Sequence, residues 1–369
     1  MKSLLKGLKD EEKFILYAIQ IKPLKENSLC LDFNITNLDW DYIIKIGERE
    51  RICCFIYSAV KRLNIHLNKY QFNKLKELKN KEEYIQLLWM LELKEVLKSF
   101  NRNNIEVVLL KGGYLAFNIY PQGFRRLSDI DILVRKADIL NIKNILKQNG
   151  FNIVYSISEV NNLTFRNKSG ITFEVHTELG ILSDLIDVDE FFNNTMSIKI
   201  NNISCKVLKP DYNLIYLSLH YSITHSFYNL VSLADINEFI RKENKRIDIV
   251  KTINFSKKNS IYKAVFIPIS FTNVIWETKL DGFTNHISLG LLLKYLIKYN
   301  FKNSLSGYNN KIVTLLGYVI PILLVGSFMK NFKIISKFLY KRILNIKLIK
   351  FIRNNIISLR RRRNDISCR

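Results

Sequence analysis

Two aspartates separated by one residue, within an apolar run, constrain the fold of this 369-residue chain more than any other feature. The run SDIDILV extends from Ser128 to Val134. On a strand, alternate side chains share a face, so Asp129 and Asp131 would point to one side and the isoleucines to the other. Two neighbouring carboxylates repel each other unless a cation lies between them, and Mg²⁺ is usually held by one or two carboxylates plus substrate phosphates. The run therefore indicates either a metal site or a half-buried strand with an acidic outer face.

A glycine turn lies upstream of the acidic run. Residues 105–110 are apolar and rich in β-branched side chains, Lys111-Gly112-Gly113 follows, and residues 114–120 suit a short helix. Such a turn lets backbone N–H groups approach a phosphate, with assistance from the helix dipole. A glycine pair alone also fits a simple tight turn. The order of turn and acidic strand makes phosphate binding the more specific interpretation.

A third carboxylate is available in the run ITFEVH, which ends at His176. Its apolar residues alternate with Thr172, Glu174 and His176, so Glu174 and His176 would share a polar strand face. If this strand neighbours the acidic strand, Glu174 completes a three-carboxylate site for two metals, of the kind that clamps the attacking and leaving oxygens in phosphoryl-type transfer. Glu174 is also a candidate base for an acceptor hydroxyl. The alternative is a solvated strand face.

The periodicity of apolar residues predicts an α+β fold. Strands are expected near 105–110, 129–134, 151–156, 163–167 and 171–176, alternating with short helices. Helical spacing dominates before this region and returns after Asp211. We predict a helical N-terminal region over 1–103, an α/β core over 104–208, a helical C-terminal domain over 209–300, and an apolar segment plus basic amphipathic tail over 301–369.

Two histidines in the C-terminal helical domain are candidates for a lesser role. His220 and His225 lie on a predicted helix, and Asp235 follows on the next one. Residues five apart do not share a face at 3.6 residues per turn. We interpret them as polar residues packed between helices. The alternative is that this hairpin borders the cleft and contacts the base or the acceptor.

Positive charge is concentrated at the C-terminal end. The chain has a net charge of +24, and residues 301–369 hold 15 Lys or Arg and one acid. Residues 312–329 carry no charge, but Gly317, Pro321 and Gly326 interrupt them, which favours a broken core helix over a membrane span. Residues 330–369 are basic and amphipathic. Contact with an anionic membrane surface, contact with RNA, and packing on the chain's own core are the three interpretations.

Cysteine usage points to a reducing compartment. The five cysteines are scattered and contain no CxxC pair, which argues against a disulfide framework or a zinc site. The first residues contain no apolar run long enough for a signal peptide. We expect a cytoplasmic protein. The basic tail would also allow a peripheral position at the inner membrane surface.

The segments carrying these motifs resemble a known family. The run LLKGGYLAFNIYPQGFRRLSDIDILV, then Gly150-Phe151, then FEVHTEL, is similar to the bacterial nucleotidyltransferase family of the polymerase-beta-like superfamily, often described as uncharacterised nucleotidyltransferases. The resemblance covers about residues 38–242. Two features depart from the wider superfamily: its Gly-Ser is Gly-Gly here, and the gap from Gly113 to Asp129 is long.

The resemblance implies a polymerase-beta-like core, a small mixed sheet with helices, flanked by helical regions. It implies transfer of a nucleoside monophosphate from a nucleoside triphosphate, with ATP the expected donor and two Mg²⁺ ions. Asp129, Asp131 and Glu174 would be both catalytic residues and metal ligands. The residues expected to contact the bound nucleotide are Lys111, Gly112, Gly113, Arg125, Ser128 and His176.

The resemblance leaves the acceptor open. A small molecule, a peptide or protein hydroxyl and an RNA end are all compatible with the site. A phosphotransferase on the same residues is one alternative function, since similar sites move only a terminal phosphate. A non-catalytic scaffold that binds nucleotide or membrane is the other, although an unused cluster of like charges would only cost stability.

Overall fold

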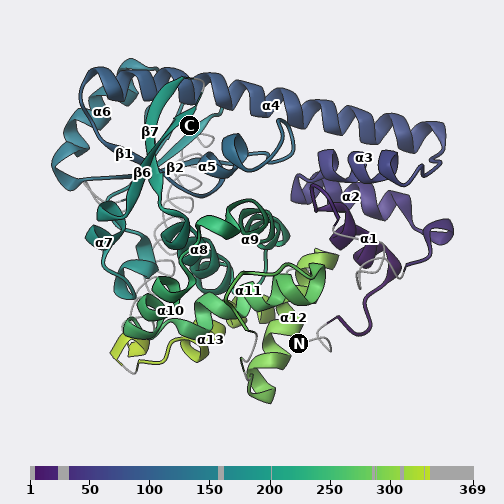
Figure 1. Cartoon of the computed structure of the whole chain (residues 1–369). Coiled ribbons are helices and arrows are strands. Elements are labelled where there is room, and N and C mark those ends of the chain that lie inside the picture. The colour runs from purple at the N-terminus through teal and green to yellow at the C-terminus, as the bar shows by residue number, and fades with distance from the viewer. Residues whose placement is uncertain are drawn as a thin grey trace, which may run out of the picture. The chain divides into compact units, whose positions relative to one another are not determined.

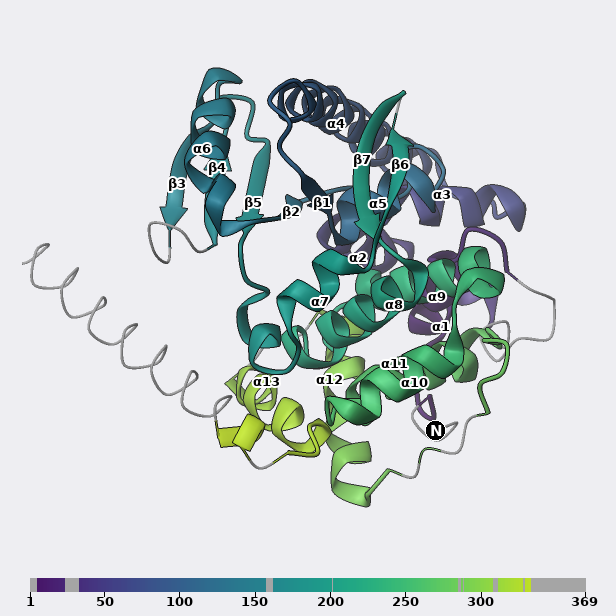
Figure 2. The same cartoon turned by 60° about the vertical axis from the view of Figure 1, so that its left-hand side comes forward.

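The computed structural model describes residues 5–23, 33–156, 162–200, 202–284, 287, 289–307, 311–327 and 329–332. The chain divides into two compact units, Met1–Gly326 and Ser327–Arg369. The first unit contains the sheet and all of the helices labelled in Figures 1 and 2. Nearly all of the basic tail predicted over 330–369 lies outside the described residues, so its interpretations stay predictions.

Helices precede, interrupt and follow seven strands. The strands are β1 (Val107–Leu109), β2 (Ile130–Val134), β3 (Asn152–Ser156), β4 (Leu163–Arg166), β5 (Thr172–His176), β6 (Thr195–Ile200) and β7 (Ile203–Leu208). The first helices are α1 (Asp10–Ala18), α2 (Trp40–Glu50), α3 (Cys53–Arg62), α4 (Lys69–Arg102), α5 (Lys111–Asn118), α6 (Ile139–Gln148) and α7 (Val188–Asn193). The later ones are α8 (Pro210–Leu219), α9 (Leu230–Glu243), α10 (Ile249–Lys258), α11 (Tyr262–Trp276), α12 (Leu291–Ser306) and α13 (Lys311–Leu324).

The seven strands form one mixed sheet in the order β3-β4-β5-β2-β1-β7-β6. Strands β2 and β5 matter most for the site, because they pair in parallel and place Asp131 opposite Glu174. Strand β1 runs antiparallel to β2 and parallel to β7. The predicted α+β fold is confirmed, and all five predicted strands are present.

The hairpin of β6 and β7 was not predicted from the sequence. The two strands pair antiparallel, from Thr195 opposite Leu208 to Ile200 opposite Ile203. Asn202 has a φ of 67°, in the left-handed region that Asn tolerates better than most residues. Two six-residue runs separated by Asn201 and Asn202 are the available hairpin signal, because tight hairpin turns favour Asn and Gly.

The long helix α4 links the sheet to the N-terminal helices. It has 34 residues and contacts β7 and α6, and also α2 and α3. Figure 1 shows it running from the side of the sheet out over α3. Asp39 caps α2 by accepting a hydrogen bond from the Tyr42 amide at 2.9 Å. Because α4 contacts both the sheet and α2, it holds α2 next to the core.

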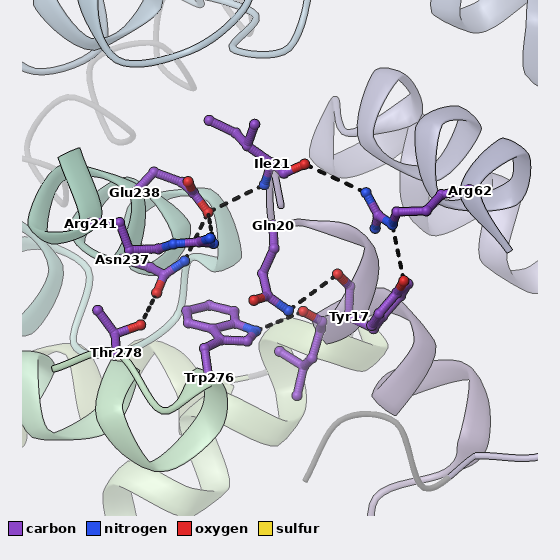
Figure 3. Close-up of polar contacts among 10 residues, drawn as sticks. Tyr17, Gln20, Ile21, Arg62, Asn237, Glu238, Arg241, Trp276 and Thr278 are labelled. Atoms are coloured by element: carbon purple, nitrogen blue, oxygen red, sulfur yellow. Dashed lines mark hydrogen bonds and ion pairs between the residues drawn. The ribbon is translucent and has the colours of Figure 1, made fainter. Parts of the chain in front are cut away.

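Polar contacts tie α1 to the C-terminal helices (Figure 3). The Glu238 carboxylate on α9 accepts hydrogen bonds from the Ile21 amide at 3.2 Å and from Asn237 Nδ2 at 2.9 Å. The buried Trp276 indole at the end of α11 donates to the Leu16 carbonyl at 2.8 Å. Because buried polar groups are costly without partners, these bonds fix α1 against α9 and α11.

The uncharged segment predicted over 312–329 is largely helix α13. This helix has 14 residues, with Pro321 inside it, and Leu316, Ile320 and Leu324 are buried. Within the part of the chain that the structure describes, no helix combines the length and the apolar character needed to cross a membrane.

Candidate functional site

Two adjacent parallel strands bring the acidic and imidazole side chains together. Asp131 on β2 lies opposite Glu174 on β5, and Leu133 lies opposite His176. Because side chains two residues apart share a strand face, Glu174 and His176 project on the same side. Asp131 is 2% exposed, whereas the Glu174 side chain is 37% exposed. The site therefore has a buried acid at its base and an accessible one at its rim.

Asp131 is the centre of the hydrogen bonding. Its Oδ1 accepts a hydrogen bond from Lys111 Nζ at 2.8 Å and lies 2.8 Å from His176 Nε2. His176 Nε2 is also 3.6 Å from Glu174 Oε2, and His176 Nδ1 lies 2.9 Å from Asn162 Oδ1. One potential ligand atom from each of Asp131, Glu174 and His176 lies within 4.8 Å of the others. This spacing allows the three residues to hold one metal ion.

The pKa values of the two aspartates are shifted in opposite directions. Burial alone would raise the pKa of Asp131, but Lys111 and His176 outweigh it and hold that pKa far below its usual range. Burial likewise opposes the charge of Lys111, yet Asp131 raises the Lys111 pKa. The pKa of Asp129 is raised to about 6, by burial and then by repulsion from Asp131. A cation near both carboxylates would relieve this repulsion.

Asp129 immediately precedes strand β2 and is half-buried. Ser128 Oγ lies 3.3 Å from Asp129 Oδ1, and both residues sit at the entrance to the strand. Among the described residues, the group that meets the metal-ligating spacing contains Asp131, Glu174 and His176 but not Asp129. The role of Asp129 as a metal ligand stays a prediction.

The donor set fits a divalent cation. The carboxylate oxygens of Asp131 and Glu174 are the ligand type that Mg²⁺ prefers. The imidazole of His176 is more typical of transition-metal sites. Asn162, which faces the other nitrogen of the His176 ring, was not among the predicted site residues. Fixing the far nitrogen of a ligating histidine is a usual arrangement around metals, but no sequence pattern marked Asn162.

The two glycines of the predicted phosphate turn are packing positions. Both are buried in the first turn of α5. A Cβ on Gly113 would lie 2.7 Å from Leu109 Cδ1, and one on Gly112 would lie 2.9 Å from Leu127 Cδ2. Glycine therefore allows α5 to approach β1 and the loop before β2. Lys111, the first residue of α5, has a φ of 42°, a strained value for a lysine. Contact of these three residues with a triphosphate stays a prediction.

Arg125 is bound to Asp235 in the structure. Its Nε donates to Asp235 Oδ1 at 2.9 Å and its Nη2 to Oδ2 at 3.0 Å, the bidentate geometry of the strongest ion pairs. A further nitrogen, Nη1, donates to the Arg126 carbonyl at 2.7 Å. The carboxylate is 3% exposed, so the pair is buried. Arg125 thus joins the loop before β2 to α9, and its predicted contact with phosphate stays a prediction.

The expectation that His220 and His225 do not share a face is wrong. A π-turn over His220–Thr224 follows α8, and the His225 amide donates to the His220 carbonyl at 3.0 Å. Because a π-turn joins residues five apart, the two ring centroids lie only 4.5 Å from each other. Burial and then the Lys111 charge lower both pKa values, that of His225 to about 4.

The end of α8 borders the acidic cluster. Lys111 Nζ lies 6.0 Å from the centre of the Tyr216 ring, and the Lys111 charge also acts on His220. Tyr216 was not predicted as a site residue, although its position four residues before His220 places both on one helix face. Burial of both rings agrees with the prediction that they pack between helices, and the end of α8 also lies near Lys111. Contact of this hairpin with a base or an acceptor stays a prediction.

Comparisons with known proteins find a family model and a solved structure that are similar to this chain. A family model described as "Uncharacterised nucleotidyltransferase" matches residues 36–267. A solved structure of an antigenic nucleotidyltransferase-like protein from Paracoccidioides brasiliensis is 15% identical, with a TM-score of 0.33, over 54% of this chain and 93% of that one. A search of curated proteins finds no match.

Proposed function

The chain belongs to the family described as uncharacterised nucleotidyltransferase, and on this premise we propose that it transfers a nucleoside monophosphate from a nucleoside triphosphate to an acceptor hydroxyl. The observation that carries the proposal is the grouping of Asp131, Glu174 and His176 on adjacent parallel strands, with Asp129 at the entrance to the first. ATP is the proposed donor. The acceptor is proposed only as a class, a hydroxyl on a small molecule, a peptide or protein, or an RNA end.

Asp131 and Glu174, with Asp129 beside them, are the proposed ligands of Mg²⁺, and the three carboxylates suit two ions. Bound there, Mg²⁺ would neutralise charge on the triphosphate as the reaction proceeds. The chain's own residues set the geometry. His176 lies between Asp131 and Asn162 and keeps the Asp131 carboxylate in one orientation. The Lys111 ammonium stabilises the ionised form of Asp131 at the base of the site.

Glu174 is the proposed base for the acceptor hydroxyl. A general base must be reachable by the substrate. Glu174 is exposed, whereas Asp131 opposite it is buried. In-line attack by the deprotonated hydroxyl on the α-phosphorus forms the new P–O bond and releases pyrophosphate. Positioning and charge neutralisation provide most of the rate in such reactions, so few other catalytic groups are required.

The label transferred from ATP tests the reaction type. The protein is incubated with Mg²⁺, a panel of hydroxyl acceptors, and ATP labelled with radioactive phosphorus at the α or at the γ position. We expect the acceptor to carry label from α-labelled ATP only, with a mass increase of one nucleoside monophosphate. Label from the γ position alone would contradict nucleotidyl transfer and establish the phosphotransferase alternative. EDTA is expected to stop the reaction in either case, because it removes the Mg²⁺ that the carboxylates are proposed to bind.

Glu174→Gln is expected to lower kcat/KM by about 10²–10⁴-fold, the usual contribution of a general base. The change preserves size but removes the proton acceptor and one anionic ligand. Glu178→Gln is the matched control, because Glu178 lies on the same segment and pairs with Lys136 on the surface. Steady-state kinetics with the acceptor found above measure both variants. Wild-type kinetics for Glu174→Gln would remove Glu174 from the mechanism.

A further inference from the structure

A polar pocket lined largely by arginines lies beside the acidic cluster of Asp129, Asp131 and Glu174. Its volume is about 230 Å³. It is lined by the end of α2, the loop before β2 and the start of α9. Its polar walls are made by Arg49, Glu50, Arg51, Arg125, Arg126, Ser128 and Asn229. Ser128 lines the pocket and also contacts the acidic cluster, because its Oγ lies 3.3 Å from Asp129 Oδ1. A ligand in this pocket would therefore lie next to the proposed metal site.

Two of the four arginines are already committed to other groups. Arg49 Nε donates to Glu50 Oε1 at 2.7 Å, and its other nitrogens donate to the Ser304 and Ser306 carbonyls at the end of α12. Arg125 is bound to Asp235. Arg49 binds the end of α12, and Arg125 joins the loop before β2 to α9. Both guanidinium groups are paired with a carboxylate, so they supply little free positive charge to the pocket.

The other two arginines, Arg51 and Arg126, have no ion pair among the described residues. Arg51 has an exposed side chain at the end of α2. The Nε of Arg126 is buried and has no hydrogen-bond partner in the described part of the chain. Burial and then repulsion from Arg51 lower the pKa of Arg126, and the nearby Glu82 carboxylate offsets them only in part. Two like charges held together, with a buried N–H left over, are unfavourable unless an anion binds between them.

The start of α9 adds backbone donors on the same side. Asn229 caps this 14-residue helix by accepting from the Ser232 amide at 2.9 Å, and Asn229 and Val231 line the pocket. The first amides of a helix have no acceptor within it, and the helix dipole places positive potential there. Guanidinium groups and a helix start converge on one small pocket, which is the usual arrangement for binding phosphate.

We infer that this pocket binds one phosphate-class anionic group, held by Arg51, Arg126 and the first amides of α9. The volume of about 230 Å³ suits a single phosphate group with its immediate substituents better than a whole nucleotide. The anion site rests on this geometry alone. Its assignment to a substrate rests on the proposed function, under which the anion is either the terminal phosphate of the donor or a phosphate carried by the acceptor.

Phosphate binding to the full chain in EDTA tests the pocket without requiring catalysis. Calorimetric titration with inorganic phosphate compares the wild type with Arg126→Gln and with Arg51→Asn, the latter chosen because Asn tolerates the left-handed φ of 60° at this position. Each variant is expected to weaken phosphate binding by about tenfold or more, the loss typical of one charge-assisted hydrogen bond. Arg102→Gln, which removes an exposed arginine at the end of α4, is the matched control and should bind like the wild type.

Wild-type phosphate affinity in both variants, or no saturable binding by the wild type, would overturn the inference. Unchanged thermal denaturation of Arg51→Asn guards against loss of folding. Titration of ATP into phosphate-saturated protein then identifies the source: weakened ATP binding assigns the pocket to the donor, and unchanged binding assigns it to the acceptor. Asp131→Asn should retain phosphate binding, so a failure of the transfer reaction leaves this result intact.

Discussion

Asp131→Asn is expected to lower kcat/KM for nucleotidyl transfer by about 10³-fold or more, equivalent to about 4 kcal/mol of transition-state stabilisation. The substitution keeps the shape of the side chain but removes the charge that Lys111 and His176 contact through a single oxygen. Asp131 also contributes a ligand to the one described group with metal-binding spacing. Steady-state kinetics measure the loss. Asp189→Asn, a change at an exposed aspartate 4.0 Å from Arg135, is the control.

A loss of folding has to be separated from a loss of chemistry in this experiment. Without the Asp131 charge, the largely buried Lys111 ammonium loses the carboxylate that it hydrogen-bonds and keeps only the more distant charge of Asp129. Breaking a buried pair costs up to about 3–5 kcal/mol. The double variant with Lys111→Met removes that unpaired charge. We expect it to recover unfolding free energy, measured in urea, while transfer stays lost. A double variant that recovers both would show that Asp131 acts only on stability.

The strands that carry the acids were predictable because the chemistry and the periodicity coincide. Asp131 and Glu174 each alternate with buried apolar residues, so the sequence marks both the strand and the face. Local sequence patterns do not encode which strands are neighbours. The pairing of β2 with β5, and the register that places Asp131 opposite Glu174, depend on the tertiary fold. Asn162 next to His176 depends on a different pairing, the antiparallel one of β4 with β5.

Other parts of the site escaped prediction for identifiable reasons. His220 and His225 were separated by assuming 3.6 residues per turn, whereas the π-turn closes over five residues. Arg51 reaches the pocket of Arg126 from α2, 75 residues earlier in the chain, because α4 holds α2 against the core. Neither feature leaves a pattern in a single sequence, since both depend on how separate elements pack.

Breaking the buried pair of Arg125 and Asp235 is expected to lower the free energy of unfolding by about 3–5 kcal/mol. Either Arg125→Met or Asp235→Leu leaves one charge buried without its partner, and urea denaturation measures the loss. The pair joins residues 110 positions apart, in the loop before β2 and in helix α9, so the substitutions weaken one wall of the pocket that Arg125 lines. Arg102→Gln serves as the exposed-arginine control here too.

The double variant Arg125→Met/Asp235→Leu separates the two roles that Arg125 has been given. Apolar residues of similar volume often replace a buried ion pair with little loss, so the double variant should regain most of the unfolding free energy lost by either single variant. If Arg125 serves mainly to join the loop to α9, phosphate binding and transfer recover with stability. If stability recovers but the affinity for ATP stays low, the guanidinium contacts the triphosphate directly, as the sequence resemblance implies. A single Arg125→Met variant with wild-type stability would contradict the structural role, because the structure leaves Asp235 buried and unpaired in that case.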